Sequence, residues 1–267
     1  MSKKPPIKIE DVRAEIDRVD NALLSLIAER LELAAAVRRA KSGVRFWRPS
    51  REESHIRELA AATEDTPPEL VSRIWAELMS ASIALQGPMK LHIALEGDAL
   101  DVWTLVRDRF GAAIPAMSYP TTSSALAAAY EDDEGVAVLP APGGMNSWWT
   151  ALGARGAMPD MHILSGLPRT GDEDWPRAVA VSTADIQPSG ADETLLICNR
   201  GTEISGAKLR AEAGEHILVS IEGYLETAPD NTKIIGSLPS LWVTQNDYRD
   251  ASHYWRRAYW LFYRPRG

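Results

Sequence analysis

Two cations lie on what should be the apolar side of the first long helix that the sequence predicts. Residues 9–41 repeat apolar side chains at helical spacing, and this stripe consists of Val12, Ile16, Val19, Leu23, Ile27, Ala34 and Val37. Arg30 and Lys41 fall on the same stripe. Their separation corresponds to about 1100° of helical rotation, so the side chains point within about 20° of each other and lie about 16 Å apart along the axis. Because cations on a core-facing side need anions, the pair predicts an anionic ligand.

Further polar residues accompany these cations in the next two expected helices. Arg51 and Glu52 stand in the first turn of a helix that begins near Ser50. The third helix carries Ser82 and Gln86 beside its apolar stripe, at the i, i+4 spacing of neighbours on a helix face. We therefore expect polar side chains at several places beside the apolar core.

The start of the second helix also has the spacing of a capping box. Ser50 and Glu53 match the S-x-x-E pattern, in which each side chain binds a backbone N–H group of the first turn. We therefore expect the side chains of Ser50 and Glu53 to cap the N-terminus of the second helix.

Arg13 stands on the first helix but cannot reach the same ligand within one chain. It lies about 25 Å from Arg30 along the axis and points about 100° away. A helix of about 33 residues is about 50 Å long, and a three-helix unit cannot cover a seam of that length alone. If Arg13 contributes to the site, it must come from a second copy that crosses antiparallel, so we expect a homodimer.

The order of these residues resembles a known family. The segment V-R-A-E-I-D-x-x-D-x-x-L-L-x-L-I-A-E-R-x-E-L-A-x-x-V-x-x-A-K, followed by R-E and then S-x-x-x-Q, is similar to the all-helical AroQ class of chorismate mutase. The resemblance covers residues 9–87. It implies an intertwined dimer of three-helix subunits that converts chorismate to prephenate without a cofactor.

The resemblance also implies a role for each residue. The positions that hold the substrate carboxylates are matched by Arg13, Arg30 and Arg51, and Arg13 would reach into the neighbouring site. The donors to the ether oxygen are matched by Lys41 and Gln86. The acceptor for the ring hydroxyl is matched by Glu52, and a polar wall residue by Ser82. The chain departs from the family at Arg48, where many members carry an acid. Arg48 either supplies another carboxylate contact or is a solvated loop residue, and Glu52 is left as the lone acceptor.

The chemistry suits these residue types. Chorismate is a dianion that must be held in a compact conformer before its Claisen rearrangement, and guanidinium forks bind carboxylates in a fixed geometry. As the carbon–oxygen bond breaks, negative charge builds on the ether oxygen, so a fixed ammonium and an amide donor stabilise the transition state more than the ground state. Lys41 and Gln86 are therefore the predicted catalytic donors, and the predicted catalytic set also includes the carboxylate-binding Arg30 and the acceptor Glu52.

Each residue alone also has an ordinary structural explanation, and two other functions stay open. Lys41 could be a helix-end cation, Arg30 an ion-paired surface residue and Glu52 a first-turn acid. Their joint order favours the site. The alternatives are an isochorismate pyruvate lyase-like pericyclic enzyme, which would use much the same cations, and a catalytically silent scaffold or binding protein.

Composition excludes several other classes. The 267 residues contain 29 Lys and Arg against 37 Asp and Glu, a formal charge of −8, and residues 1–87 are balanced at 14 of each. Neither part is a basic domain, so nucleic-acid binding is not expected. The sequence has neither a long apolar run nor a signal-peptide pattern, so we expect no membrane association and a cytoplasmic location. The histidines are scattered and the single Cys198 lies in an apolar run, so we expect no metal site and a small core residue at Cys198.

After Pro88 the pattern changes to an α/β domain, so we divide the chain into residues 1–87 and 88–267. Strands are expected at 91–95, 114–119, 135–140, 161–164, 178–182, 194–198 and 216–223, and helices at 99–109, 121–130, 147–153 and 205–213. This alternation favours a largely parallel sheet.

The second part is similar to a truncated prephenate dehydratase, although that family's own motifs are absent. Arg177-Ala178-Val179 stands in place of Thr-Arg-Phe, and Leu95-Glu96-Gly97-Asp98 replaces a glycine- and serine-rich substrate loop. Residues 205–209 and 220–223 resemble an ACT-like remnant. We therefore expect a non-catalytic domain with a regulatory or interaction role.

Overall fold

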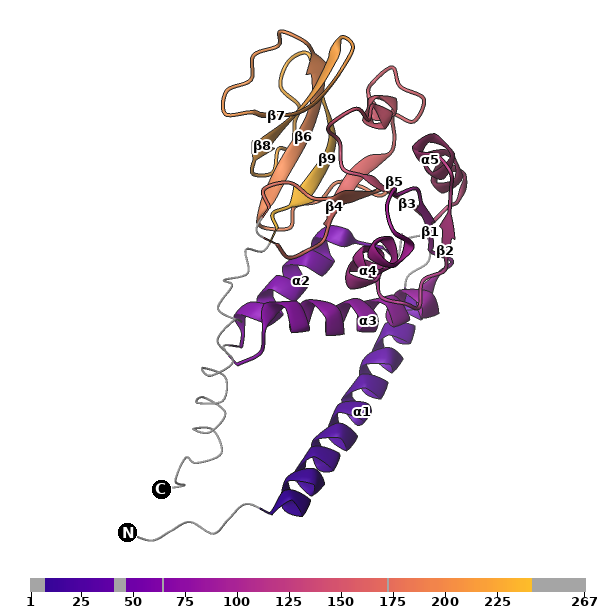
Figure 1. Cartoon of the computed structure of the whole chain (residues 1–267), viewed down its shortest axis with the longest axis vertical. Coiled ribbons are helices and arrows are strands. Elements are labelled where there is room, and N and C mark those ends of the chain that lie inside the picture. The colour runs from indigo at the N-terminus through magenta and orange to yellow at the C-terminus, as the bar shows by residue number, and fades with distance from the viewer. Residues whose placement is uncertain (1–7, 41–46, 64, 172, 242–267) are drawn as a thin grey trace, which may run out of the picture.

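The first helix of the chain projects away from everything else. The computed structural model describes residues 8–40, 47–63, 65–171 and 173–241. Helix α1 (Ile9–Ala40) has 32 residues and, at 1.5 Å per residue, is about 48 Å long. It meets the rest of the molecule only at its C-terminal end, and every residue from 8 to 26 is exposed (Figure 1). The far half of α1 therefore has no covering partner within the described chain.

Helices α2 (Pro49–Ala61) and α3 (Pro68–Gln86) complete the helical part, but the predicted capping box of α2 is wrong. The cap residue is Arg48, and no side chain caps the helix. Ser50 instead donates to the backbone oxygen of Gln187 at 2.6 Å, and Glu53 is buried in ion pairs. Both side chains that the local pattern predicted to cap the helix therefore bind residues of the α/β part instead.

The α/β part contains one nine-stranded sheet with the order β2-β1-β3-β5-β4-β9-β6-β8-β7. The strands are β1 (Lys90–Ile93), β2 (Ala116–Ser118), β3 (Gly135–Pro140), β4 (His162–Leu167), β5 (Ala178–Ser182), β6 (Asp192–Asn199), β7 (Lys208–Ala213), β8 (His216–Glu222) and β9 (Thr232–Pro239). The helices are α4 (Ala99–Phe110), α5 (Thr122–Glu131) and the short 3-10 helix η1 (Trp148–Leu152). A helical part followed by an α/β part confirms the predicted fold class.

The prediction of a largely parallel sheet is wrong, because most of the strand pairings are antiparallel. Pairings β1–β2, β1–β3 and β4–β9 are parallel, whereas β3–β5, β4–β5, β6–β8, β6–β9 and β7–β8 are antiparallel. Parallel neighbours need a long crossover, which α4 and α5 supply between the first three strands. Beyond β3, connections such as residues 168–177 and 214–215 are short enough to reverse the chain directly.

The helix predicted at 205–213 is also wrong, because most of this segment forms β7. Lys, Leu, Arg, Ala and Glu favour a helix by propensity, but β7 pairs with β8 through a two-residue turn that begins at Gly214, with φ 58°. Strand β9 was not predicted. Cross-strand pairing has overridden the local preference here.

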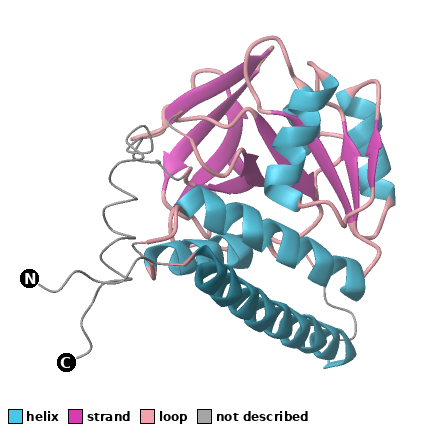
Figure 2. Ribbon diagram, turned by 60° about the horizontal axis from the view of Figure 1, so that its bottom comes forward, coloured by secondary structure: helices cyan, strands magenta, loops and turns pink. Residues whose placement is uncertain are grey.

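The helical part shares a hydrophobic core with the sheet. Trp47 and Ile83 belong to the same buried cluster as Phe110, Val106 and the strand residue Leu91. The ring centroids of Trp47 and Phe110 lie 5.8 Å apart. Figure 2 shows the helices that precede the sheet in the chain gathered below the strands. Helices α2 and α3 are therefore packed on the α/β part, whereas α1 is not.

Candidate functional site

Arg30 and Ser82, two of the predicted site residues, meet where α1 crosses α3. Arg30 Nη1 donates to Ser82 Oγ at 2.8 Å and to the backbone oxygen of Leu78 at 3.0 Å. Ser82 is buried and Arg30 is half-buried. Burial lowers the pKa of Arg30, but a guanidinium keeps its charge in proteins. The contact fixes a half-buried positive charge beside the apolar stripe.

The other predicted cation and amide positions are spread over the helices. Gln86 is the last residue of α3, half-buried and one turn beyond Ser82, so both lie on the same side of the helix. Arg51 is exposed in the first turn of α2, and Arg13 is exposed near the far end of α1. Lys41 lies outside the described residues. Within one chain, the described structure thus joins Arg30 to Ser82 and leaves Arg13 on the surface.

Glu52 faces the α/β part. Its Oε2 accepts a hydrogen bond from Arg109 Nη1 on α4 at 3.1 Å, and its side chain is 13% exposed. Burial raises the pKa of Glu52, and the nearby Arg109 and Arg169 only partly counter that rise. The sequence predicted a lone acceptor at this position, and the structure gives it a cationic partner from the second part of the chain.

Glu53 joins Glu52 in a buried charge network, which comprises Glu52, Glu53, Arg109, Arg169, Ser72 and Ser165. Arg109 Nη2 lies 3.0 Å from Glu53 Oε1, and Arg169 Nε lies 2.9 and 3.1 Å from the two oxygens of Glu53. Arg109 also donates to Ser165 at 2.8 Å, and Arg169 to Ser72 at 2.9 Å. The network therefore ties α2 and α3 to α4, β4 and the segment after β4.

The two arginines of this network were not predicted. Burial raises the pKa of Glu53, but the ion pairs with Arg169 and Arg109 outweigh burial and leave that pKa below its ordinary value. The sequence did show two adjacent acids, Glu52 and Glu53, at the start of a helix. Spacing alone could not show that they pair with arginines more than 50 positions away.

Arg48 contacts the loop between β5 and β6. Its Nη2 donates to Gln187 Oε1 at 3.3 Å, and the side chain is half-buried. Arg48 thus helps to dock the start of α2 on the α/β part, together with Ser50 and Ser54, which both donate to backbone oxygens of the same loop.

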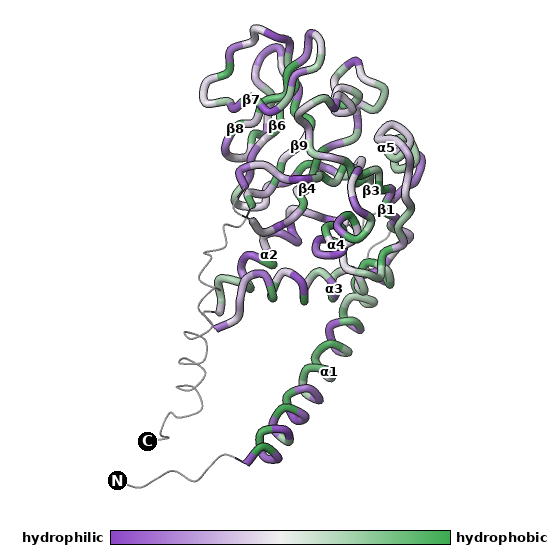
Figure 3. Tube along the Cα trace, in the orientation of Figure 1, coloured by the Kyte–Doolittle hydropathy of each residue, from purple (hydrophilic) through white to green (hydrophobic). Residues whose placement is uncertain are grey.

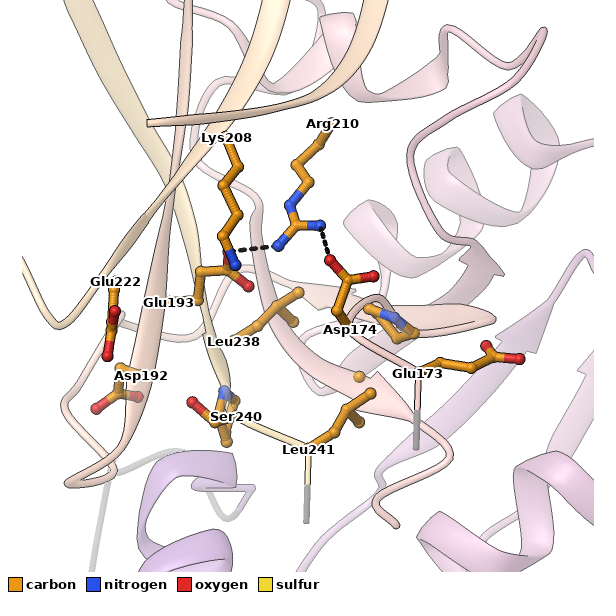
Figure 4. A pocket seen from close by; sticks show the side chains of 13 residues that line it. Glu173, Asp174, Asp192, Glu193, Lys208, Arg210, Glu222, Leu238, Ser240 and Leu241 are labelled. Atoms are coloured by element: carbon orange, nitrogen blue, oxygen red, sulfur yellow. Dashed lines mark hydrogen bonds and ion pairs between the residues drawn. The ribbon is translucent and has the colours of Figure 1, made fainter. Parts of the chain in front are cut away.

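An acid-rich cavity lies where β6, β7 and β9 meet the loop after β4 (Figure 4). Its volume is about 310 Å³, and its charged lining residues are Glu173, Asp174, Asp192, Glu193, Glu222, Lys208 and Arg210. Arg210 pairs with Glu193 at 2.6 Å and with Asp174 at 3.2 Å, and it stacks over Trp175. Several of these charges therefore hold the strands and the loop together.

A second cavity of about 660 Å³ lies beside η1 and contains Cys198 and Lys233. Lys233 Nζ donates to the backbone oxygens of Leu152 and Pro159, so it ties down the loop after η1. Cys198 is buried, as the sequence predicted, and burial raises the pKa of its thiol. A thiol in that state is a poor nucleophile.

The residues at which the sequence departs from the dehydratase motifs have structural roles in this chain. Asp98, in the segment that replaces the substrate loop, caps α4 by accepting from the backbone N–H of Leu100 at 2.9 Å. Ala178 and Val179 are buried in β5. Among the described residues, no group of three His, Cys, Asp or Glu side chains could hold a metal ion, and no helix is long and apolar enough to cross a membrane.

Residues 12–87 match the family described as chorismate mutase type II. The helical segment that contains Arg30, Glu52, Ser82 and Gln86 is therefore a chorismate mutase type II domain, and the resemblance seen in the sequence is confirmed.

The relatives of the chain include two proteins named bifunctional chorismate mutase/prephenate dehydratase. That of Pseudomonas aeruginosa is 35% identical over 101 residues, which cover 34% of this chain and 27% of the relative. That of Stutzerimonas stutzeri is 33% identical over the same length, with the same coverage. The T-protein of Enterobacter agglomerans is 40% identical over 75 residues, which cover 27% of this chain and 20% of the relative. The matches thus span about a quarter of the length of these relatives.

A solved structure described as GqqA, a novel type of quorum quenching acylases, overlaps 62% of this chain and 100% of its own, with a TM-score of 0.40 and 14% identity. A likeness of that size is too small to establish a shared fold.

Proposed function

We propose that this protein is a chorismate mutase that converts chorismate to prephenate. The observation that carries the proposal is the half-buried Arg30, held by Ser82 at the α1–α3 crossing inside the matching domain. A guanidinium fixed by a neutral hydroxyl and a carbonyl keeps its positive charge for an outside anion, as binding of a dicarboxylate requires. No nucleophile, general base or cofactor is needed for the rearrangement.

In this proposal the side chains act by position and charge. The two carboxylates of the compact conformer are held by Arg30, by Arg51 and by the partner's Arg13. Lys41 and Gln86 donate to the ether oxygen as negative charge develops there, and Glu52 accepts from the ring hydroxyl. Ser82 forms a polar wall and orients Arg30. Arg48, docked on Gln187, takes a supporting role at the start of α2.

The proposal includes a homodimer built on α1. The exposed stripe of α1 contains Val12, Ile16, Val19 and Leu23, and Leu23 is 51% exposed. Figure 3 shows hydrophobic positions recurring along the whole projecting helix. An apolar stripe of this length in water favours burial against a second copy. An antiparallel crossing would also carry Arg13 to the other end of its partner's α1, where Arg30 lies.

Leu23→Glu is expected to weaken this dimer strongly without unfolding the chain. Each dimer would lose two buried leucines, or about 3 kcal/mol or more, which corresponds to at least about 100-fold in the dissociation constant. Light scattering over a dilution series measures the change. Ala28→Glu is the matched control, because residue 28 points about 140° away from residue 23 on the helix. Equal weakening by both variants, or none by Leu23→Glu, would contradict a dimer built on this stripe.

The division at residue 87 and the role of residues 88–267 stay proposals. We infer that the second part is non-catalytic and regulatory or interactive, since positions such as Asp98 serve as helix caps in place of the dehydratase motifs. Conversion of prephenate to phenylpyruvate by the purified protein would overturn that inference. The ACT-like remnant at residues 205–209 and 220–223 likewise stays a proposal. The cytoplasmic location also stays a prediction.

The central test is incubation of the purified full chain with chorismate and, separately, with isochorismate. Loss of chorismate absorbance with prephenate as the product is the expected result. Release of pyruvate from isochorismate, without turnover of chorismate, would favour the lyase alternative. No turnover of either compound would favour a silent scaffold. Repeating the chorismate assay with aromatic amino acids asks whether the second part regulates the first.

A further inference from the structure

Arg109, a residue of the second part, contacts the hydroxyl acceptor expected in the mutase domain. It lies near the end of α4 and is 2% exposed. Its guanidinium donates hydrogen bonds from Nη1 to Glu52 at 3.1 Å and from Nε to Ser165 at 2.8 Å, while Nη2 lies 3.0 Å from Glu53 as an ion pair without a hydrogen bond. The guanidinium is planar and rigid, so the two hydrogen bonds fix its orientation.

The charge around Glu52 comes mainly from the second part of the chain. The charged groups that face it are Arg109 of α4, Arg169 of the segment after β4, and Glu53 of its own helix. The hydrogen bond from Arg109 ends on Oε2, and a carboxylate has further lone pairs for a second donor. Glu52 is therefore held in place while part of its side chain stays exposed.

We propose that Arg109 is a positioning residue of the mutase site: it acts through Glu52, whose orientation and negative charge it maintains for the ring hydroxyl of the substrate. This inference rests on the proposed function. It gives the second part a direct effect on catalysis without contact to the substrate, and it gives a reason for the close docking of α2 on α4.

The two arginines of the network make different contacts, which separates positioning from simple structural support. Arg169 is equally buried, but its hydrogen bonds go to Glu53 and Ser72 and none to Glu52. A network that only supports the fold would respond alike to loss of either arginine. A positioning role predicts a larger effect on Glu52 from loss of Arg109.

The experiment is the pH profile of kcat/KM for chorismate in full-length Arg109→Gln, Arg109→Lys and Arg169→Gln chains. Activity that needs ionised Glu52 falls as pH drops through the pKa of Glu52. Removing the nearest cation favours the neutral acid, so Arg109→Gln is expected to move this acid limb upward by about one pH unit. Arg109→Lys should recover part of the shift, and Arg169→Gln should move the limb less. In a Glu52→Gln background, Arg109→Gln should produce no further shift.

An NMR titration of the Glu52 carboxyl carbon follows the same ionisation without turnover. An unmoved titration in Arg109→Gln, equal shifts for the two arginines, or a shift that persists with Glu52→Gln would each overturn the inference. If Arg109→Gln fails to fold by circular dichroism, Arg109→Lys is compared with Arg169→Lys, and a limb that moves no more in Arg109→Lys than in Arg169→Lys would count against positioning. A wild-type chain that leaves chorismate unchanged would overturn the proposed function itself.

Discussion

A chain with Glu53→Gln is expected to unfold with about 3–5 kcal/mol less free energy than the wild type, because the change leaves buried positive charge without its main partner. Glu53 is buried and contacts both Arg109 and Arg169 at about 3 Å. A glutamine retains the shape and some hydrogen bonds but not the charge. Urea unfolding followed by circular dichroism measures the loss, provided that the m-value stays constant.

Asp108→Asn is the matched control for this variant. Asp108 precedes Arg109 on α4 and forms an exposed ion pair with Arg73 at 3.6 Å. Exposed pairs contribute about 1 kcal/mol or less, so the control is expected to stay close to the wild type. A Glu53 variant as stable as the control would mean that the network adds little to the fold.

The Glu53 prediction also carries a pH dependence with a definite sign. The folded-state pKa of Glu53 is below its ordinary value of 4.5, so its stabilising effect is present above pH 4.5 and is lost as pH falls through the folded pKa. The stability gap between the wild type and Glu53→Gln should therefore narrow in acid. A gap that widens below pH 4.5 would contradict the assigned ion pairs.

Local patterns predicted most elements but not the contacts between distant ones. The apolar stripe fixed α1, and the alternation of helices and strands located β3 and β5 to the residue. The helix predicted for residues 208–213 was wrong because their pairing with β8 outweighs the helical preference of these residues. The prediction of a largely parallel sheet was wrong because short connections after β3 reverse the chain, so most pairings there are antiparallel and only β4–β9 is parallel.

In the candidate site too, the sequence predicted relations within one helix but not contacts between distant elements. Helical spacing placed Ser82 and Gln86 on one side of α3, and the structure adds that Ser82 holds Arg30. Spacing could not show that Glu52 and Glu53 turn toward α4, because Arg109 lies more than 50 residues away in the sequence. The capping pattern at Ser50 even favoured the wrong partner for Glu53.

Lys41→Ala is expected to lower kcat for chorismate by about 100- to 1000-fold, or about 3–4 kcal/mol of transition-state stabilisation. Lys41 lies outside the described residues, so the expectation comes from its place on the stripe and from the family resemblance. A donor to the ether oxygen acts mostly in the transition state, so kcat should fall more than KM rises. Steady-state loss of chorismate absorbance measures both constants.

Arg39→Ala is the matched control for Lys41→Ala. Arg39 is an exposed cation in the last turn of the same helix, about 180° around the axis from Arg30. It should leave kcat near the wild-type value. If Lys41→Ala also left kcat intact, the proposed site would be wrong.

A mixture of two inactive variants then tests whether Arg13 crosses between protomers. In a heterodimer of Arg13→Ala and Lys41→Ala, one site carries both changes, whereas the other combines the intact Lys41 of one chain with the intact Arg13 of its partner. After unfolding and refolding together, random pairing should restore about a quarter of the wild-type sites. If Arg13 served its own chain, each site would contain one defect in every pairing, and no activity would return. Recovery in the mixture would therefore place Arg13 in the partner's site, the arrangement that the exposed length of α1 leads us to expect.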